Sequence, residues 1–228
     1  MTWLNSLFFG ILPYVAFFAF FLITILRYRT RTFTYSSLSS QFLENRWHFW
    51  AVVPFHYGIL MVLAGHIGAW LLPHQILWWN ADPVRLIALE ATGLASGLLT
   101  LVGAGAAIWR RVSINSVRNV TSLGDWIVYG LLMIQVITGI GVALHYPWGS
   151  SWYASVAAPY FWSIARFNPQ IDLIAVMPLL VKIHVVNAYL TIGYFPFTRL
   201  VHVLVVPNPY LWRKAQVTRW YSSPQKVN

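Results

Sequence analysis

The sequence predicts an all-α membrane protein, a transmembrane bundle of five helices, and three observations lead to this prediction. First, 58% of the 228 residues are hydrophobic and only 9% are charged, whereas a soluble domain carries about 25% charged residues. Second, the apolar residues form five long runs, each near the ~20 residues that a helix needs to cross a bilayer. Third, Lys and Arg gather at the ends of these runs, as they do around membrane spans.

Each apolar run has a clear boundary in the sequence. The first gives way to a basic segment that begins at Arg27, and the second stops at Pro73. The third meets Arg110, the fourth ends at His145, and the last stops at Pro207. The predicted spans are residues 4–26, 47–72, 86–109, 126–145 and a fifth from 173 or 178 to 206, and the longest predicted loop is 146–172.

The distribution of Lys and Arg predicts the orientation of the bundle. These residues are numerous after the first and third spans and after Pro207, and scarce in the loops on the other side. Because cytoplasmic segments carry the excess of Lys and Arg, we expect the N-terminus outside the cell membrane and the C-terminus in the cytoplasm. The predicted organisation is a transmembrane domain over 1–207 and a cytoplasmic tail over 208–228, which is basic and aromatic. This tail either anchors to the membrane surface or docks a cytoplasmic partner.

Net charge and cysteine content exclude several other classes. A nucleic-acid-binding protein needs a basic face on a soluble body, so we expect no nucleic-acid partner in spite of the net charge of +10. The chain contains no cysteine. Disulfides, thiolate iron–sulfur or zinc sites and covalently attached c-type haem are therefore excluded within it.

Four of the seven histidines lie within apolar runs, where an ionisable side chain is costly and a functional role is the first hypothesis. One such histidine alone could simply hydrogen-bond a neighbouring helix. Four of them, in two pairs on two spans, favour two b-type haems, because facing helices can supply two axial imidazoles to each iron. The four residues are His56, His66, His184 and His202.

Antiparallel pairing of the second and fifth spans predicts which histidines share a haem. His66 and His184 are nearer the outer side of their spans, and His56 and His202 are nearer the cytoplasm. We therefore expect an outer haem between His66 and His184 and an inner haem between His56 and His202.

The spacing of the histidines is unequal on the two spans. The fifth-span pair is 18 residues apart, about five helical turns, so both residues face one way. The second-span pair is 10 residues apart, which puts it roughly 80° off one face. We expect helix tilt, or a local distortion near Pro54 or Pro196, to accommodate the difference. A lone divalent metal ion is a weaker hypothesis, because it favours carboxylates and these spans have almost none.

Polar and small residues near these spans have two interpretations each. Haem propionates bind cations and hydroxyl groups, although the positive-inside rule alone also explains the arginines. On the outer side either Arg85 or Lys182 could hold a quinone carbonyl or a propionate. Glycine and alanine in the third span could make room for a macrocycle, but close helix packing is the favoured interpretation. The candidates for inner propionates are Arg110, Arg111, Arg199 and Ser36, and those for quinol protons are Asp82, Glu90 and Asp172, which could equally be solvated loop residues.

At these residues the sequence resembles the gamma subunit, or cytochrome b subunit, of membrane-bound respiratory nitrate reductase. The similarity covers most of the chain, and the 18-residue spacing of His184 and His202 also fits. The matching stretches are Leu12-Pro13-Tyr14, Leu26-Arg27-Tyr28, Ser39-Ser40-Gln41, Phe55-His56-Tyr57-Gly58-Ile59-Leu60, Gly65-His66, Pro73-His74, Ala95-Ser96-Gly97 and Phe195-Pro196-Phe197-Thr198-Arg199-Leu200-Val201-His202.

The resemblance implies a five-helix subunit with its N-terminus outside and one haem b on each side. It implies that quinol from the membrane pool is oxidised near the outer haem. Electrons then pass inward to an iron–sulfur subunit and a molybdenum catalytic subunit, both cytoplasmic. The chain would thus be the quinol-oxidising subunit of an enzyme whose terminal reduction occurs on a partner.

The resemblance also implies roles for single residues. Arg85 occupies the position of a basic residue near the family's quinol site, where the family has lysine, and Gly65 and His66 line the same region. Arg111 matches a position near the propionates of the inner haem. The segment 146–176 differs from the family pattern, so no quinone specificity is carried over from it.

Two alternatives remain at this point. Related cytochrome b subunits serve other reductases, such as those for heterodisulfides or sulfur compounds. A haem-free membrane scaffold or transporter is the other class. A transporter would show broken helices at corresponding positions of two repeats and charged residues at mid-membrane, and the sequence shows neither.

Overall fold

The computed structural model describes residues 3–31, 34, 40, 43–44 and 46–205 of the chain, and within these residues all regular structure is helical. Ser36 and the predicted tail 208–228 lie outside the described residues. Within the described part, five helices are long and apolar enough to cross a membrane, so the prediction of a five-helix all-α bundle is confirmed.

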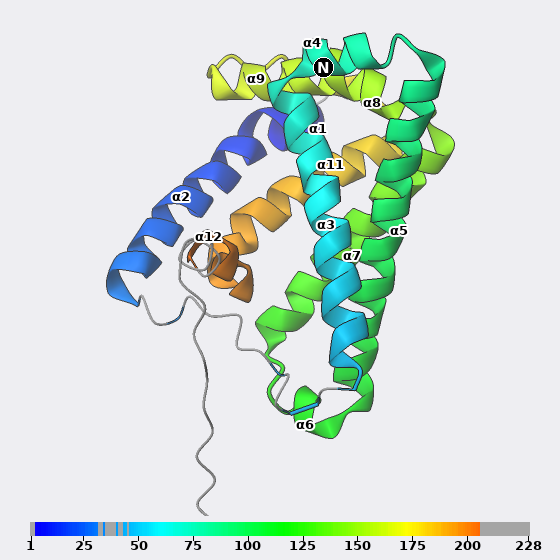
Figure 1. Ribbon diagram of the computed structural model, residues 1–228. Helices are drawn as coiled ribbons and strands as arrows, with labels where there is room; N and C mark the ends of the chain where they lie inside the picture. The colour runs from blue at the N-terminus through cyan, green and yellow to red at the C-terminus, as the bar shows by residue number, and fades with distance from the viewer. Residues whose placement is uncertain (1–2, 32–33, 35–39, 41–42, 45, 206–228) are drawn as a thin grey trace, which may run out of the picture.

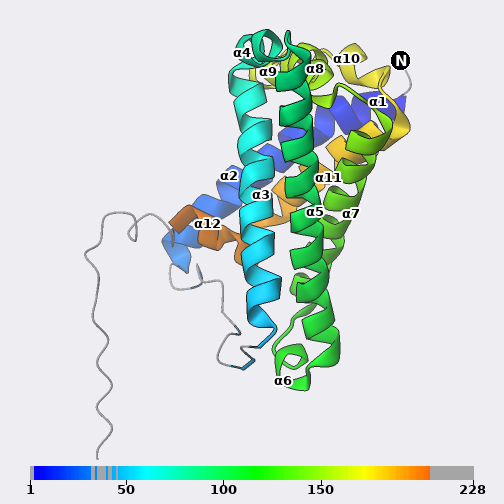
Figure 2. The ribbon, with the colours of Figure 1, turned by 45° about the vertical axis from the view of Figure 1, so that its right-hand side comes forward.

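The five candidate spans form a bundle in which two helices lean across three upright ones. The upright helices α3, α5 and α7 run side by side, while α2 and α11 run obliquely to them (Figures 1 and 2). The helical elements of the five spans are α1 (Trp3–Ser6), η1 (Leu7–Ile11) and α2 (Leu12–Thr30), then α3 (His48–Leu71), α5 (Pro83–Ser113), α7 (Leu123–His145) and α11 (Leu179–Tyr194).

Short helices cover the two ends of the bundle. One end, called here the α9 end, lies beside the N-terminus, and the opposite end, the α6 end, holds the turn between α5 and α7 (Figure 1). The sequence predicted loops at both places, but much of the connecting chain is helical. The elements at the α9 end are α4 (Pro73–Trp79), α8 (Gly149–Trp152), η3 (Tyr153–Ala157), α9 (Ala158–Ala165) and α10 (Asp172–Ala175), and α6 is Asn115–Arg118.

Large apolar side chains face outward along all the candidate spans. Phe18 on α2 is 68% exposed, and Tyr57 on α3 is 69% exposed. The buried residues of the spans include many small ones, such as Ala16, Ala69 and Ala104. This inversion of a soluble protein's pattern is expected where lipid surrounds the bundle, since lipid replaces water around the outer face.

A proline near the start of the first span is compensated from another helix. Pro13 has no N–H, so it cannot donate to the carbonyl of Phe9 one turn earlier. The hydroxyl of Tyr160 on α9 donates to this Phe9 carbonyl at 2.8 Å, and the backbone next to the proline forms the π-helical turn η1. The α9 end is thereby fastened to the first span.

Helices α3 and α5 approach each other most closely at two glycines. A Cβ atom built on Gly103 would meet the backbone of Phe55, and one built on Gly58 would lie 2.6 Å from the Thr100 nitrogen. No side chain fits at either position, because backbone stands where the Cβ would be. Close packing therefore explains these two glycines, as the sequence favoured for the third span.

The fifth span is broken within the segment that the sequence predicted to run to residue 206. Helix α11 ends at Tyr194 and is followed by two 3₁₀ turns, η4 (Phe195–Phe197) and η5 (Arg199–Val201), and then by α12 (His202–Val205). Pro196 lacks the N–H that a continuous helix needs and disfavours helical geometry in the residue before it. The distortion expected near Pro54 or Pro196 is thus found at Pro196, while α3 continues through Pro54.

An arginine of the first span holds this break in place. One terminal nitrogen of Arg27 donates to the carbonyls of Pro196 at 2.6 Å and Thr198 at 2.9 Å. The Thr198 hydroxyl accepts from the N–H of Leu200 and so begins η5. Backbone groups that a helix would have paired are therefore bonded to side chains, as a membrane interior requires.

The α3–α5 contact gives a test with a control in the same helix. Gly103→Ala should destabilise the protein by about 1–3 kcal/mol, because the added methyl forces the two backbones apart. Gly105→Ala adds the same methyl where nothing lies within 4 Å and should be neutral or stabilising by about 0.5–1 kcal/mol. Thermal unfolding of the detergent-solubilised protein measures both, and equal effects of the two variants would contradict the packing explanation.

The role of Arg27 can be tested at the break itself. Arg27→Gln removes charged donors from two carbonyls, each hydrogen bond contributing about 1.5–3 kcal/mol. Hydrogen exchange should therefore become faster within residues 195–202 than elsewhere in the fifth span. Arg29→Gln changes an exposed arginine of the same helix and should leave the exchange unaltered. Unchanged protection of 195–202 in Arg27→Gln would show that the break holds without this side chain.

Candidate functional site

The structure brings the four intramembrane histidines together in two pairs. The ring centroids of His66 on α3 and His184 on α11 are 6.3 Å apart, with 35° between the ring planes. Those of His56 on α3 and His202 on α12 are 6.4 Å apart, with 64° between the planes. The first pair lies toward the α9 end of α3 and the second toward its α6 end. These are the partners that the antiparallel arrangement of the two spans predicts.

Three of these imidazoles are oriented by their own backbone. The Nδ1 atoms of His56 and His66 lie 2.8 Å from the carbonyls four residues earlier, those of Val52 and Val62. The Nδ1 atom of His202 lies 2.7 Å from the carbonyl of Arg199. A carbonyl only accepts, so each Nδ1 carries the proton and each Nε2 keeps a lone pair. That tautomer is the one in which Nε2 can ligate a metal.

His184 is oriented by helix α7 instead. Its Nδ1 lies 2.9 Å from the hydroxyl oxygen of Thr138, and its Nε2 lies 3.0 Å from the amide nitrogen of Gln135. The Gln135 carbonyl oxygen accepts from the amide of Asn187 on α11 at 2.6 Å. Gly139 lies against the same ring, since a Cβ there would be 3.0 Å from Cε1 of His184.

The separation of the rings within each pair fits an iron held between them. A metal–imidazole bond is about 2.0–2.1 Å long, and the centre of a five-membered ring with bonds of about 1.33 Å lies about 1.1 Å from its nitrogen. Two imidazoles on opposite sides of one metal ion therefore have centroids ~6.2–6.4 Å apart. The two measured separations, 6.3 and 6.4 Å, agree with this value.

The donor set suits a haem better than a lone metal ion. Among the residues that the structure describes, no three His, Cys, Asp or Glu side chains come together as a metal site. Each histidine pair offers two ligands, which suits an iron whose other ligands belong to a macrocycle. Helix α3 packs along α5, and α11 packs along α7 and α2, whereas α3 and α11 make little direct contact in the described structure. Helix α3 is thus held by α5, and α11 by α7 and α2, and the paired imidazoles span the distance between the histidine-bearing segments.

The segment after the fourth span contacts His66. The hydroxyl of Tyr153 on η3 donates to the His66 carbonyl at 3.2 Å, and its ring meets the imidazole edge-on at 5.4 Å. The indole N–H of Trp162 on α9 donates to the carbonyl of Trp70 at 2.9 Å. Burial raises the pKa of Tyr153 to about 12, so the phenol keeps its proton and remains a donor at neutral pH.

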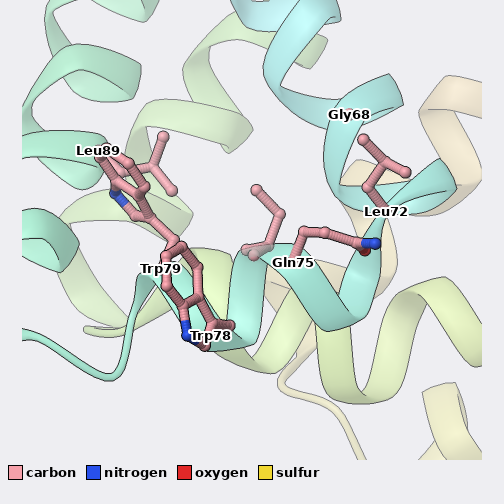
Figure 3. A pocket seen from close by; sticks show the side chains of 7 residues that line it. Gly68, Leu72, Gln75, Trp78, Trp79 and Leu89 are labelled. Atoms are coloured by element: carbon pink, nitrogen blue, oxygen red, sulfur yellow. The ribbon is translucent and has the colours of Figure 1, made fainter.

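An apolar pocket lies beside Arg85 at the same end of the bundle. It has a volume of about 320 Å³ and is walled by α3, α4 and α5 (Figure 3). The Arg85 guanidinium stacks over two tryptophans of that wall, at 4.9 Å from the Trp78 ring and 5.4 Å from the Trp79 ring. Within the described part of the chain its buried Nε has no hydrogen-bond partner. The lining residues are Gly68, Leu72, Gln75, Ile76, Trp78, Trp79 and Leu89.

Gly65 and His66 lie on α3 near this pocket but on different faces. Gly65 is three residues before Gly68, on the pocket side of the helix, and a Cβ there would meet nothing within 4 Å. His66 faces His184 instead. Two of the three acidic residues considered as proton acceptors have structural partners. Asp82 caps α5 by accepting from the N–H groups of Val84 and Arg85.

The other two acidic residues, Glu90 and Asp172, differ from each other in their surroundings at the α9 end. Glu90 on α5 accepts from the backbone and the hydroxyl of Ser150, at 2.7 and 2.6 Å, and so joins α5 to α8. Asp172 is exposed at the start of α10. Glu90 therefore has a bonded structural role, and Asp172 fits a solvated position.

The arginines considered for inner propionates differ in their surroundings. Arg110 is buried and bonded to Glu44 at 2.6 Å, which commits its charge to the loop before α3. Burial opposes the charge of Glu44, but hydrogen bonds from Trp47 and Arg110 outweigh it, so the Glu44 pKa is lowered. Arg199 pairs with Asp125 at 2.9 Å.

Arg111 has fewer hydrogen bonds to its guanidinium than Arg110 has. Its guanidinium lies over the Tyr129 ring at 4.6 Å, and one terminal nitrogen donates to the Ala107 carbonyl at 3.2 Å. Its buried Nε has no hydrogen-bond partner in the described segments. An anionic group of a bound cofactor could accept from this donor.

Sequence reasoning missed the residues that orient the histidines. Gln135 and Thr138 stand within an apolar run three residues apart, so they share one face of α7. That spacing, together with Asn187 three residues after His184, predicts a polar contact between the fourth and fifth spans. Arg27 was read only as a positive-inside residue, because nothing in the sequence links it to Pro196.

Comparisons with known proteins identify the family. The family model for the nitrate reductase gamma subunit matches residues 5–221. The respiratory nitrate reductase 2 gamma chain of Escherichia coli K12 is 33% identical over 96% of this chain and 98% of its own length. The nitrate reductase gamma chain of Bacillus subtilis 168 is 30% identical over 92% of this chain and 96% of its own.

A more distant relative belongs to another type of reductase. The Hdr-like menaquinol oxidoreductase cytochrome b-like subunit of Archaeoglobus profundus is 25% identical over 84% of this chain and 59% of its own length. The family model and the two nearly full-length relatives at 30% identity or more outweigh it. The chain therefore belongs to the nitrate reductase gamma subunit family.

Proposed function

We propose that this chain is the di-haem, quinol-oxidising membrane subunit of a respiratory nitrate reductase. The single observation that carries the proposal is the pair of 6.3 and 6.4 Å separations between imidazoles at two heights of the same helix. Bound there, two b-type haems supply one-electron transfer across the membrane. Family membership and the five candidate spans support the same function.

The histidines act as oriented neutral ligands in this proposal. His66 and His184 would hold the outer haem, and His56 and His202 the inner one. Their Nδ1 protons are bonded to carbonyl or hydroxyl oxygens, which fixes the ring orientation and raises the basicity of Nε2.

Arg111, Arg199 and Ser36 are the proposed partners of the inner propionates. Arg111 is favoured most, because its Nε has no hydrogen-bond partner within the described residues. Arg199 would share its charge with Asp125. Ser36 lies outside the described residues, so its role rests on the sequence alone.

The pocket of Figure 3 is the proposed quinol site. Its apolar wall suits a quinone ring, and ligand sites of this kind pair such walls with a few placed polar groups. Arg85 would donate to a quinone oxygen, since its Nε is buried without a partner within the described chain. Trp78 and Trp79 hold the guanidinium by cation–π contact. Gly65 lies about one turn before Gly68 on α3, and a Cβ there would meet nothing within 4 Å, so this part of the helix surface is open.

Sidedness and partners complete the proposal. The basic residues beyond the α6 end favour a cytoplasmic location for that end and an outward N-terminus. Protons from quinol would then leave at the α9 end, on the outer face of the cytoplasmic membrane. An iron–sulfur subunit and a molybdenum catalytic subunit would bind on the cytoplasmic side, where the tail 208–228 would contribute to docking.

A cytochrome b subunit of another quinol-linked reductase is the second candidate. The Archaeoglobus profundus relative, named a menaquinol oxidoreductase subunit, favours it. Both candidates share the histidine pairs, so the subunits that copurify with the chain distinguish them. A haem-free transporter is less well supported, because the break at Pro196 places the His202 ring beside the His56 ring, the arrangement that a haem requires.

Removing single histidines tests the proposed ligation. His66→Ala or His184→Ala should eliminate one of two b-type signals in the dithionite-reduced minus oxidised spectrum, together with quinol oxidation. His56→Ala or His202→Ala should remove the other signal. His145→Ala is the matched control, because His145 also bonds the carbonyl four residues earlier, at 2.8 Å, but belongs to neither pair. A wild-type protein without b-type absorption would refute the proposal.

Arg85 provides a separate test of the quinol site. Arg85→Ala should lower kcat/KM for quinol about 10–100-fold, the effect of losing a charge-assisted hydrogen bond of about 1.5–3 kcal/mol. The haem spectrum should stay intact, and Arg85→Lys should retain most of the activity. Arg166→Ala removes an exposed arginine from the same end and serves as the control. Wild-type quinol kinetics in Arg85→Ala would place the site elsewhere.

A further inference from the structure

His184 differs from the other three paired histidines in what its Nδ1 contacts. The others bond carbonyls of their own segments. His184 contacts a side chain of a different helix, the hydroxyl of Thr138 on α7, at 2.9 Å. Thr138 is buried, so this hydroxyl is not replaced by solvent. A substitution at Thr138 can therefore remove the hydroxyl that orients His184. No substitution removes the backbone carbonyls that orient the other three histidines.

The direction of the Thr138 contact follows from where its proton goes. The Thr138 hydroxyl lies 2.6 Å from the carbonyl of Ile134. A carbonyl cannot donate, and a hydroxyl has one proton. That proton therefore goes to Ile134, and the oxygen presents a lone pair to His184. The imidazole must donate, so its proton sits on Nδ1.

The amide of Gln135 lies against the same ring. Its carbonyl oxygen accepts from the Asn187 amide at 2.6 Å, and Asn187 also donates to the Leu131 carbonyl at 3.0 Å. With its oxygen committed to Asn187, Gln135 turns its NH₂ group toward Nε2 of His184, at 3.0 Å. The same amide nitrogen lies 3.3 Å from Nδ1, so Gln135 contacts both ring nitrogens and does not select a tautomer. The tautomer of His184 therefore follows from Thr138, which accepts a hydrogen bond from Nδ1–H and leaves the lone pair on Nε2.

We propose that Thr138 is a positioning residue that sets the tautomer and basicity of His184 and thereby tunes the haem on the His66–His184 pair alone. The inference rests on the proposed haem ligation and adds a residue to it. An acceptor on Nδ1–H raises the basicity of a ligating imidazole. A more basic ligand stabilises the ferric state, so the Thr138 hydroxyl lowers the reduction potential of that haem. The haem on His56 and His202 has no such side-chain acceptor among the described contacts of its ligands.

A redox titration of the full-length protein in its membrane complex tests this. Thr138→Val keeps the shape of the side chain and removes the hydroxyl. We expect the equilibrium preference of one b-type haem for the ferric state to fall about tenfold. Its reduction potential would then rise by ~59 mV for one electron. The second haem should keep its potential, and Thr138→Ser should restore the wild-type value. Thr92→Val is the control, since Thr92 also donates to the carbonyl four residues earlier, at 2.7 Å, and hydrogen-bonds no histidine within the described structure.

The outcomes separate this inference from the haem assignment itself. A wild-type protein without two b-type signals would overturn the proposed function and the inference with it. Two normal signals with unshifted potentials in Thr138→Val would overturn only the inference, as would a shift of the haem that His56→Ala removes. If Thr138→Val does not accumulate in membranes, Thr138→Ala provides the same test, with the same upward shift expected. An unshifted Thr138→Ala would then overturn the inference.

Discussion

The need to pair every backbone polar group inside a bilayer is the constraint on which the rest of this structure depends. Pro13 interrupts the first span and Pro196 interrupts the fifth. Each interruption is stabilised by a side chain from another helix. The Phe9 carbonyl next to Pro13 accepts from Tyr160, and the carbonyls at Pro196 accept from Arg27. These contacts join chain segments that are more than 150 residues apart. Irregular backbone is therefore fixed in place, and the break at Pro196 places His202 beside His56.

Packing on one face of α3 determines what the other face can do. The glycine contacts with α5 bring the two backbones together at Gly58 and Gly103. Helix α11 is held separately by α2 and α7. The two histidine-bearing segments are thus positioned by their outer neighbours and face each other through imidazole rings. Rings of opposite helices can then bind one iron from both sides without the helices themselves packing.

The α9 end combines structural and proposed functional residues within a small region. Glu90 and Asp82 fix α8 and α5, Tyr153 contacts His66, and Arg85 lies against the tryptophans of the pocket wall. Rigid support of this kind suits a site that must hold a quinol at a fixed position near a redox centre. The capping role of Asp82 and the tethering role of Glu90 are part of this support, although both carboxylates could accept protons on chemical grounds.

Hydropathy and residue type by themselves determined the five spans and the four intramembrane histidines, because burial in lipid acts on each segment separately. The pairing of His66 with His184 and of His56 with His202 also followed from antiparallel order. The sequence left open whether tilt or a distortion near Pro54 or Pro196 accommodates the histidine spacing. The tertiary structure decided that the fifth span breaks at Pro196, so the five-turn argument for His184 and His202 does not apply to it. It also decided that 146–176 is largely helical and that Thr138, Gln135 and Arg27 contact distant segments. Such contacts depend on how helices are placed relative to one another, and the periodicity of a single helix carries no record of that placement.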